Sequence, residues 1–221
     1  MMKKWIVFFA FIMLAGCLNK DNNSCSDVAL YGYVNLCLPR ISGMTECRAH
    51  PNVQQIIQRY LESGPVLGYY LNNETYKQID RLNEITYEDY FMIYGDYLRE
   101  NYHAIEVDLE IMERNLEQTL FEGENFDQVS TRVEEAYGTI TAGKPALLEK
   151  YSPQPNVRTM IVLMKYMNET GETVVISAID FILVKNRLIN LAYYMAYSGG
   201  KSIDDLKARN NEVVKKLMEL N

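Results

Sequence analysis

The stretch TVVISAIDFILVKNRLINLAYYMAY, from Thr173 to Tyr197, decides the fold. It holds two long runs of β-branched and other apolar residues, and only Lys185-Asn186 separates them. So short a connection, with an Asn in it, is typical of a tight β-hairpin turn. We therefore expect two antiparallel strands that place Val184 opposite Arg187.

This pairing divides the side chains between two faces of the sheet, and both faces are apolar. One face carries Val174, Ile176, Ala178, Ile182, Ile189, Leu191, Tyr193 and Met195. The other carries Val175, Ile179, Phe181, Leu183, Leu188, Ala192 and Tyr194. An antiparallel sheet with one face in water alternates apolar and polar residues, so we expect helices to cover both faces of this one.

Further strands should extend the sheet. Residues 156–166 are apolar and rich in β-branched residues and Met, and the turn residues 168–172 join them to the hairpin. The three runs predict a C-terminal three-stranded antiparallel meander. Residues 65–71 also predict a strand, whereas residues 84–98 fit a helix by spacing and a strand by aromatic content.

The covering helices are indicated by apolar stripes at helical spacing. Ile203, Leu206, Val213, Leu217 and Leu220 share one stripe with Asn210, which predicts a long amphipathic C-terminal helix. Shorter stripes predict helices over residues 53–61, 105–120 and 126–133. The sequence therefore predicts an α+β fold, an antiparallel sheet covered by helices.

The strand pair IDFILVKNRLINLAYY followed by a helix resembles the PsbP-like α/β/α sandwich. That family includes photosystem accessory subunits and bacterial envelope proteins. The resemblance covers roughly residues 145–220 and rests on the order of the elements. It implies a fold and transfers no activity.

The segment SGGKS, residues 198–202, looks like the end of a phosphate-binding loop. Met195 stands where such a loop needs its first Gly, so we expect no nucleotide site. We expect instead that Gly199 and Gly200 turn the chain off the last strand. Ser202 should then cap the final helix, with Asp205 completing a capping box.

The first seventeen residues have the pattern of an export signal. Lys3 and Lys4 precede an apolar run from Trp5 to Leu14, and small residues lead to a Cys. Leu14-Ala15-Gly16-Cys17 resembles the lipobox of bacterial lipoproteins. This resemblance implies cleavage before Cys17 and transfer of a diacylglycerol, which carries palmitate-type acyl chains, to its thiol. Leu18 follows in place of Asp, and this favours sorting to the outer membrane. We expect the protein to face the periplasm, and exposure at the cell surface is the alternative.

We therefore expect a signal peptide over residues 1–16, a lipidated tether over 17–27 and a single α+β domain over 28–221. Removing Lys3 and Lys4 with the signal peptide lowers the formal net charge from −7 to −9. An acidic body disfavours nucleic acid as a partner and is repelled by anionic lipid headgroups. Membrane attachment should come from the acyl chains and not from electrostatic attraction.

Three further cysteines remain if Cys17 is acylated. The simplest pairing is a disulfide between Cys37 and Cys47, and the alternatives pair Cys25 with either of them. A metal site using His50 would lack a close Cys-x-x-Cys element and an obvious fourth ligand. We expect neither a metal nor a cofactor.

Asp180 interrupts the apolar pattern of its strand, because it is a carboxylate in the middle of a strand that is apolar on both faces. In the expected register it lies opposite Leu191. Burial of an unpaired carboxylate is costly, and such a residue can mark a functional site. Arg158, Lys165 or Arg187 could pair with Asp180 if the register allows, which would make its role structural. Asp180 is the first candidate for mutation.

Tyrosine is abundant, with 17 residues in the chain. Because Tyr combines an apolar ring with a hydrogen-bonding tip, a surface of Tyr side chains would suit a sugar or a protein partner. We consider a possible ligand surface at Tyr69, Tyr70, Tyr87, Tyr90 and Tyr94. The alternative is that these rings line the seam between sheet and helices.

Three classes of function follow. The first is a lipid-anchored accessory protein of the cell envelope, without catalytic activity, that binds an envelope protein. The second is a small-ligand or glycan-binding lipoprotein. The third is an enzyme that uses Asp180 or His103, although no familiar catalytic motif surrounds either residue. We expect the first.

Overall fold

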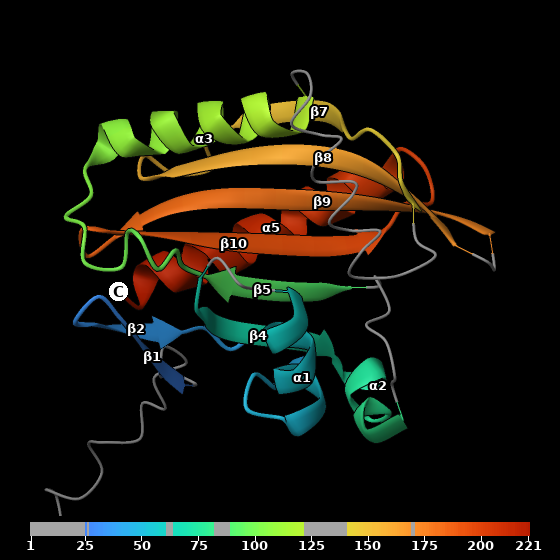
Figure 1. Ribbon diagram of the computed structural model, residues 1–221, viewed down its shortest axis with the longest axis horizontal. Helices are drawn as coiled ribbons and strands as arrows, with labels where there is room; N and C mark the ends of the chain where they lie inside the picture. The colour runs from blue at the N-terminus through green and yellow to red at the C-terminus, as the bar shows by residue number, and fades with distance from the viewer. Residues whose placement is uncertain (1–24, 26, 61–63, 82–88, 122–140, 169–170) are drawn as a thin grey trace, which may run out of the picture.

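The computed structural model describes residues 25, 27–60, 64–81, 89–121, 141–168 and 171–221. Its main sheet is antiparallel and has the spatial order β3-β4-β5-β10-β9-β8-β6, with β7 also paired to β8 (Figure 1). In chain order these strands are β3 (Met44–Glu46), β4 (Val66–Asn72), β5 (Tyr90–Tyr94), β6 (Thr141–Ala142), β7 (Ala146–Tyr151), β8 (Val157–Asn168), β9 (Gly171–Val184) and β10 (Arg187–Ala196). A separate hairpin consists of β1 (Asp27–Tyr31) and β2 (Val34–Leu38).

The expected hairpin register is confirmed. Val184 lies opposite Arg187, and β10 remains paired with β9 as far as Ala196 opposite Val175. Lys185 and Asn186 form the turn with φ angles of 49° and 58°. Two consecutive positive φ angles match the twist of the flanking strands, which explains why so short a connection closes the hairpin.

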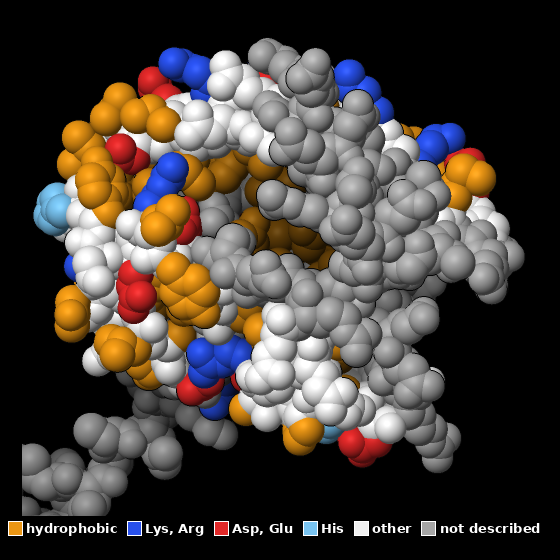
Figure 2. Space-filling view, in the orientation of Figure 1, with side chains coloured by type: hydrophobic (Ala, Val, Ile, Leu, Met, Phe, Trp, Pro, Cys, Tyr) orange, Lys and Arg blue, Asp and Glu red, His pale blue; other side chains and the backbone are white. Residues whose placement is uncertain are grey.

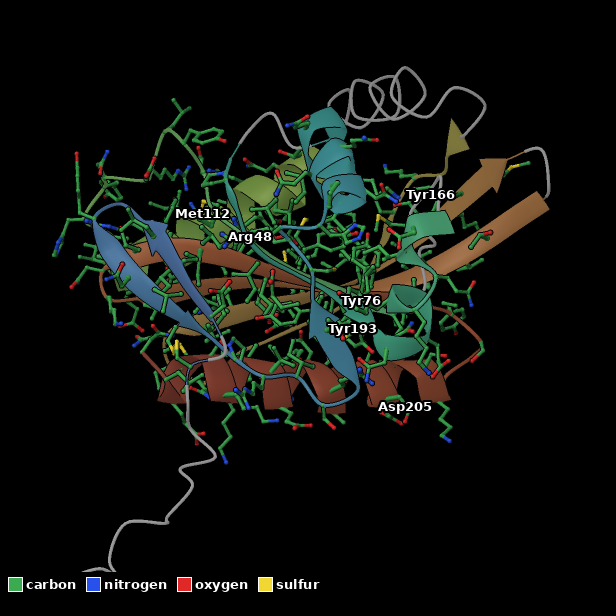
Figure 3. The ribbon with its side chains drawn as sticks, turned by 90° about the horizontal axis from the view of Figure 1, so that it is seen from below. Arg48, Tyr76, Met112, Tyr166, Tyr193 and Asp205 are labelled. Atoms are coloured by element: carbon green, nitrogen blue, oxygen red, sulfur yellow. A yellow bond between two sulfur atoms is a disulfide. The ribbon has the colours of Figure 1, made fainter. Side chains whose placement is uncertain are left out.

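Helices cover both faces of the sheet, as expected, and the fold is α+β. The long helix α5 (Lys201–Glu219) lies on one face, and α1 (Pro51–Tyr60) and α3 (Glu106–Phe121) lie on the other (Figures 1 and 3). The short helices α2 (Asn73–Tyr76) and η1 (Ile79–Arg81) follow β4. None of the helices in the described ranges is long and apolar enough to cross a membrane.

Among the residues that the structure describes, the core consists of three packed clusters. Under α5, Leu206, Val213 and Leu217 pack with Ile176, Ile182, Ile189 and Leu191, and the β1–β2 hairpin adds Ala29, Tyr31, Leu36 and Leu38. On the opposite face, Leu109 of α3 packs with Met160, Val162, Ile179, Phe181 and Leu188. Beside it, Val53 of α1 packs with Tyr69, Leu71 and Tyr90. The hairpin and α5 thus share one face, and α1 and α3 divide the other.

The ambiguous aromatic segment is resolved over its described part. Residues 90–94 form strand β5, which pairs with β4 on one side and β10 on the other. Phe91 and Ile93 pack under α5, whereas Tyr90 packs under α1. Both faces of this strand are buried, so its helix-like spacing of aromatic residues reflects no helix. The helix expected over residues 126–133 lies outside the described residues.

The corner between β10 and α5 differs from the expected capping box. The helix begins at Lys201, its N-cap is Gly200, and no side chain caps it. Ser202 is therefore already inside the helix, where its buried hydroxyl accepts a hydrogen bond from the backbone N–H of Ser198 at 3.0 Å. Gly199 has a φ of 122°, so the glycine turn was expected correctly and the Ser202 cap was wrong.

Candidate functional site

Asp180 lies in a buried polar cluster between the sheet and α5. Its side chain is fully buried. Thr159, directly opposite on β8, donates a hydrogen bond from Oγ1 to Asp180 Oδ1 over 2.5 Å. Asn210 of α5 donates from Nδ2 to the same oxygen over 3.0 Å. The cluster therefore connects two strands to the covering helix.

The carboxyl of Asp180 has an unusual proton affinity. Burial raises its pKa from 3.8 to about 7, and the two hydrogen bonds only partly offset this effect. Asp180 Oδ2 has no hydrogen-bond partner among the described residues. Burial and the charge of Asp180 also raise the pKa values of Tyr94 and Tyr151 to about 12. These neutral phenols supply no positive charge to balance the carboxylate.

None of the three cations considered as partners of Asp180 pairs with it, because each is engaged elsewhere. Arg158 lies 3.8 Å from Glu106 on α3, and Lys165 lies 2.9 Å from Glu172. Arg187 donates to the backbone oxygens of Gly32 and Tyr102. Neutral polar side chains from β8 and α5 take their place, so Asp180 has a structural environment that is enclosed from solvent.

The described tyrosines of the candidate ligand surface are buried or half-buried. Tyr69, Tyr70 and Tyr90 are between 1% and 8% exposed, and Tyr94 is half-buried, while Tyr87 lies outside the described residues. Tyr69 and Tyr70 are neighbours on β4 and therefore point to opposite faces of the sheet. The alternative reading, rings in the seam between sheet and helices, describes these residues.

The tyrosines under α1 form a stacked series across three strands. The ring centroids of Tyr69 and Tyr90 are 5.7 Å apart, and those of Tyr90 and Tyr194 are 4.7 Å apart. Figure 2 shows this face of the molecule hollowed near its centre, over β9 and β10, with hydrophobic side chains on the floor of the hollow. The aromatic series thus packs α1 onto the sheet.

A groove opens on the opposite face, between the first half of α5 and the loop before β3. Its volume is about 800 Å³, and its apolar walls come from Ile41, Met195, Ala196, Ala208 and Val213. Figure 3 labels Tyr193 from the sheet and Asp205 from α5, both of which line the groove. Segments far apart in the sequence therefore form it together.

The polar groups of this groove form a small network. Tyr193 donates its hydroxyl proton to Asp89 Oδ1 over 2.7 Å, and Arg209 Nη2 lies 3.8 Å from the same oxygen. Burial and the bond to Asp89 raise the pKa of Tyr193 above its usual value. Asp89 itself has a φ of 54°, a left-handed conformation that costs a non-Gly residue free energy. With Asp205 and Glu212 also lining it, the groove has more acidic than basic side chains.

The cysteine pairing also differs from the simplest expectation. Cys25 is bonded to Cys37, and Cys47 is a free, buried thiol. Cys47 donates to the carbonyl oxygen of Tyr69 over 3.3 Å, and burial raises its pKa to about 12. The expected Cys37–Cys47 bond was wrong because Cys47 packs under α1, whereas Cys37 lies in the hairpin on the other face.

Cys37 is also held from the end of the chain. The side chain of Asn221, just after α5, accepts from the backbone N–H of Cys37 and donates to its carbonyl oxygen, both over 2.9 Å. Lys185 donates to the same Asn221 Oδ1 over 3.1 Å. Cys25 and Asn221, which lie far apart in the sequence, are therefore both attached to Cys37.

The two histidines lie apart from these features. His50 is near Asp80, with 3.4 Å between Nε2 and Oδ1, and His103 is exposed before α3. In the part of the chain that the structure describes, no three His, Cys, Asp or Glu side chains gather as a metal site would require. Cys17 lies outside the described residues.

Comparisons with known proteins add little. No family model matches the sequence, and neither does any curated protein. Two solved structures are similar, that of the Saccharomyces cerevisiae Ran-binding protein Mog1p and that of a Mog1 point mutant. Each is 13% identical, with 87% of this chain and 89% of that chain covered and a TM-score of 0.36. A similarity of this degree supports no conclusion about function.

Proposed function

We propose that the protein is an exported, lipid-anchored accessory protein of the cell envelope that acts by binding an envelope protein. The observation that carries this proposal is the Cys25–Cys37 disulfide. Disulfides persist in oxidising compartments and are rare in the cytosol, so the bond favours export. The Leu14-Ala15-Gly16-Cys17 sequence, which precedes Cys25 by only a few residues, favours a lipid anchor at Cys17, and Leu18 in place of Asp favours the outer membrane.

The position of the disulfide also suits an anchored protein. Only seven residues separate Cys17 from Cys25. A chain rises at most about 3.5 Å per residue, so the folded body would stay within roughly 30 Å of the bilayer. A body with this short connection can contact membrane-embedded or membrane-bound partners and stays at the surface of the membrane that holds them.

The anchor is tested by palmitate labelling of the full-length protein. The wild type should incorporate labelled palmitate and fractionate with membranes. It should remain with the membranes in high salt, because the membrane binding of an acidic protein does not depend on electrostatic attraction to the lipids. Cys17→Ser should lose both properties, and Cys47→Ser, a matched change of a buried cysteine, should keep them. Equal labelling of wild type and Cys17→Ser would contradict the anchor.

The compartment is tested by counting thiols after denaturation. With Cys17 acylated and Cys25 bonded to Cys37, unreduced protein from cells should show one reactive thiol, that of Cys47, and reduced protein should show three. Three thiols without reduction would contradict export into an oxidising compartment.

A second candidate function is the binding of a small cationic ligand. The groove beside α5 favours it, because its volume of about 800 Å³ is typical of ligand pockets. Carboxylates of Asp89, Asp205 and Glu212 outnumber the single cation Arg209 in its lining. Such a ligand would enter between α5 and the loop before β3.

A further inference from the structure

Large hydrophobic side chains are exposed together at one end of the molecule. We define the end patch as Tyr33, in the β1–β2 turn, with Tyr97, Leu98, Tyr102 and Ile105, from the segment between β5 and α3. Their exposed fractions are 89%, 57%, 93%, 48% and 52%, respectively. Figure 2 shows hydrophobic side chains along this end of the molecule, at the left edge of the view. Such a group of exposed residues is unusual on a surface that contacts only water.

The two segments of the end patch are fastened to each other by Arg187. Its guanidinium donates to the carbonyl oxygen of Gly32 from Nε over 3.0 Å and from Nη2 over 2.7 Å. The same group donates from Nη1 to the carbonyl oxygen of Tyr102 over 3.0 Å. Arg187 thus bridges the β1–β2 turn and the segment before α3.

Close backbone packing fixes the same junction. Tyr31 donates its hydroxyl proton to the carbonyl oxygen of Asp96 and accepts from the Asp96 N–H, both over 3.0 Å. Gly32 approaches Glu100 so closely that an added Cβ would lie 1.6 Å from the Glu100 carbonyl oxygen. The end patch is therefore presented by a rigid scaffold, and little order has to be gained when it binds.

The tether is long enough to bring an acylated Cys17 level with the end patch. The chain takes eight residue-to-residue steps from Cys17 to Cys25 and another eight from Cys25 along β1 to Tyr33. A tether that runs back beside the hairpin therefore reaches the height of Tyr33. One membrane plane can hold both the acyl chains and the end patch.

Resting on the lipid anchor of the proposed function, we propose that the end patch sits in the headgroup region of the bilayer that holds Cys17. Tyr side chains favour this region because the ring is apolar and the hydroxyl is wet, and Leu98 supplies the group that enters deepest. The body of the protein is acidic, so apolar contact, and not charge, sets its orientation. A second contact also strengthens an attachment made by acyl chains.

The test uses tryptophan as a depth probe. The chain has one Trp, at position 5, so Trp5→Phe supplies a background without Trp. Leu98→Trp places a probe in the end patch, and Met167→Trp supplies the control. Met167 is 57% exposed and lies at the opposite end of the β8–β9 ladder, opposite Glu172. Both positions are exposed, so neither change disturbs the core.

The purified lipidated variants are reconstituted into phosphatidylcholine–phosphatidylglycerol vesicles with brominated acyl chains. Leu98→Trp should be quenched about twofold more than Met167→Trp and should emit at shorter wavelength, as expected for a ring at the membrane interface. Equal quenching of the two variants overturns the inference. A blue shift in native envelopes without one in pure lipid vesicles also overturns it, because a protein then covers the end patch.

Failure of the inference can be told apart from failure of the proposed function. Mass spectrometry of the same samples shows whether Cys17 carries acyl chains. A lipidated protein with a water-exposed probe at position 98 contradicts the end patch alone. A protein without acyl chains contradicts the proposed function, and the inference is overturned with it.

Discussion

At the scale of single residues, Asp180 makes the free energy of unfolding depend on pH. Its pKa is raised from 3.8 to about 7, so the folded protein binds one proton more than the unfolded chain between about pH 4 and pH 7. This contribution to stability is fully present below pH 4 and is lost as the pH rises through 7. The loss amounts to about 4 kcal/mol, at 1.36 kcal/mol per pKa unit.

Asp180→Asn should remove this dependence, because the amide keeps the shape of the acid without its charge. In urea unfolding at pH 8, the variant should be more stable than the wild type, and at pH 5 the difference should shrink or reverse. Glu110→Gln, a change of an exposed carboxylate on α3, should leave the pH dependence as it is. A wild type equally stable at both pH values would refute the assigned role of Asp180.

The sequence predicts the position of Asp180 but not its partners. The hairpin register alone places it opposite Leu191, and that placement is confirmed. Thr159 and Asn210 become neighbours only once β8 is in register and α5 has docked. A search for opposite charge therefore finds Arg158, Lys165 and Arg187, whereas the folded protein uses neutral donors. Asn210 in the apolar stripe of α5 was the available signal.

At the scale of elements, the β1–β2 hairpin depends on glycine where it meets the segment before α3. Gly32 and Gly43 both have positive φ angles, 55° and 73°. An added Cβ at Gly32 would overlap the Glu100 backbone, whereas the space around Gly43 is open within 4 Å. Substitution of Gly43 by Ala therefore measures the cost of backbone strain alone. The same substitution at Gly32 adds the cost of a steric clash with the Glu100 backbone.

Gly43→Ala should cost about 1 to 2 kcal/mol, the usual price of a left-handed conformation. Gly32→Ala should cost at least about 2 kcal/mol more, because the hairpin must move away from the rigid backbone of Glu100. Urea midpoints of the two variants measure the difference. Similar midpoints would show that the hairpin does not pack as tightly as described.

The elements that local sequence specifies are the ones predicted well. The β9–β10 hairpin follows from two strand-forming runs and a two-residue turn, and α5 follows from a single apolar stripe. The faces of β4 and β5 could not be predicted in this way, because both faces of these strands are apolar. Only the docking of α1 determines that Tyr69 and Tyr90 become buried.

At the scale of the whole molecule, the groove beside α5 is assembled from segments distant in sequence, so no local pattern predicts it. If it binds a cation, spermidine at ten times its Kd should stabilise the fold by about 1.4 kcal/mol and raise the Tm by roughly 3 to 5 °C. The double variant Asp205→Asn, Glu212→Gln should lose this response, and Glu110→Gln should retain it. A thermal shift that is absent, or is the same in all three proteins, would exclude the cation site.

The disulfide is likewise a property of the whole fold. Cys37 and Cys47 are closer in sequence than Cys37 and Cys25 are, and yet they lie on opposite sides of the main sheet. Sequence separation measures the cost of closing a loop and says nothing of which face each cysteine occupies. The pairing of Cys25 with Cys37 follows from the β1–β2 hairpin, which brings the two cysteines together.

The attachment of both Cys25 and Asn221 to Cys37 has a mechanical consequence. Tension on an anchored Cys17 would reach Cys25 and pass through the disulfide directly into β2, so β1 would carry no load. The side chain of Asn221, just after α5, forms two hydrogen bonds with the backbone of Cys37 in β2. A pulling force therefore cannot unzip the β1–β2 ladder from its open end, and α5 shares that force at once.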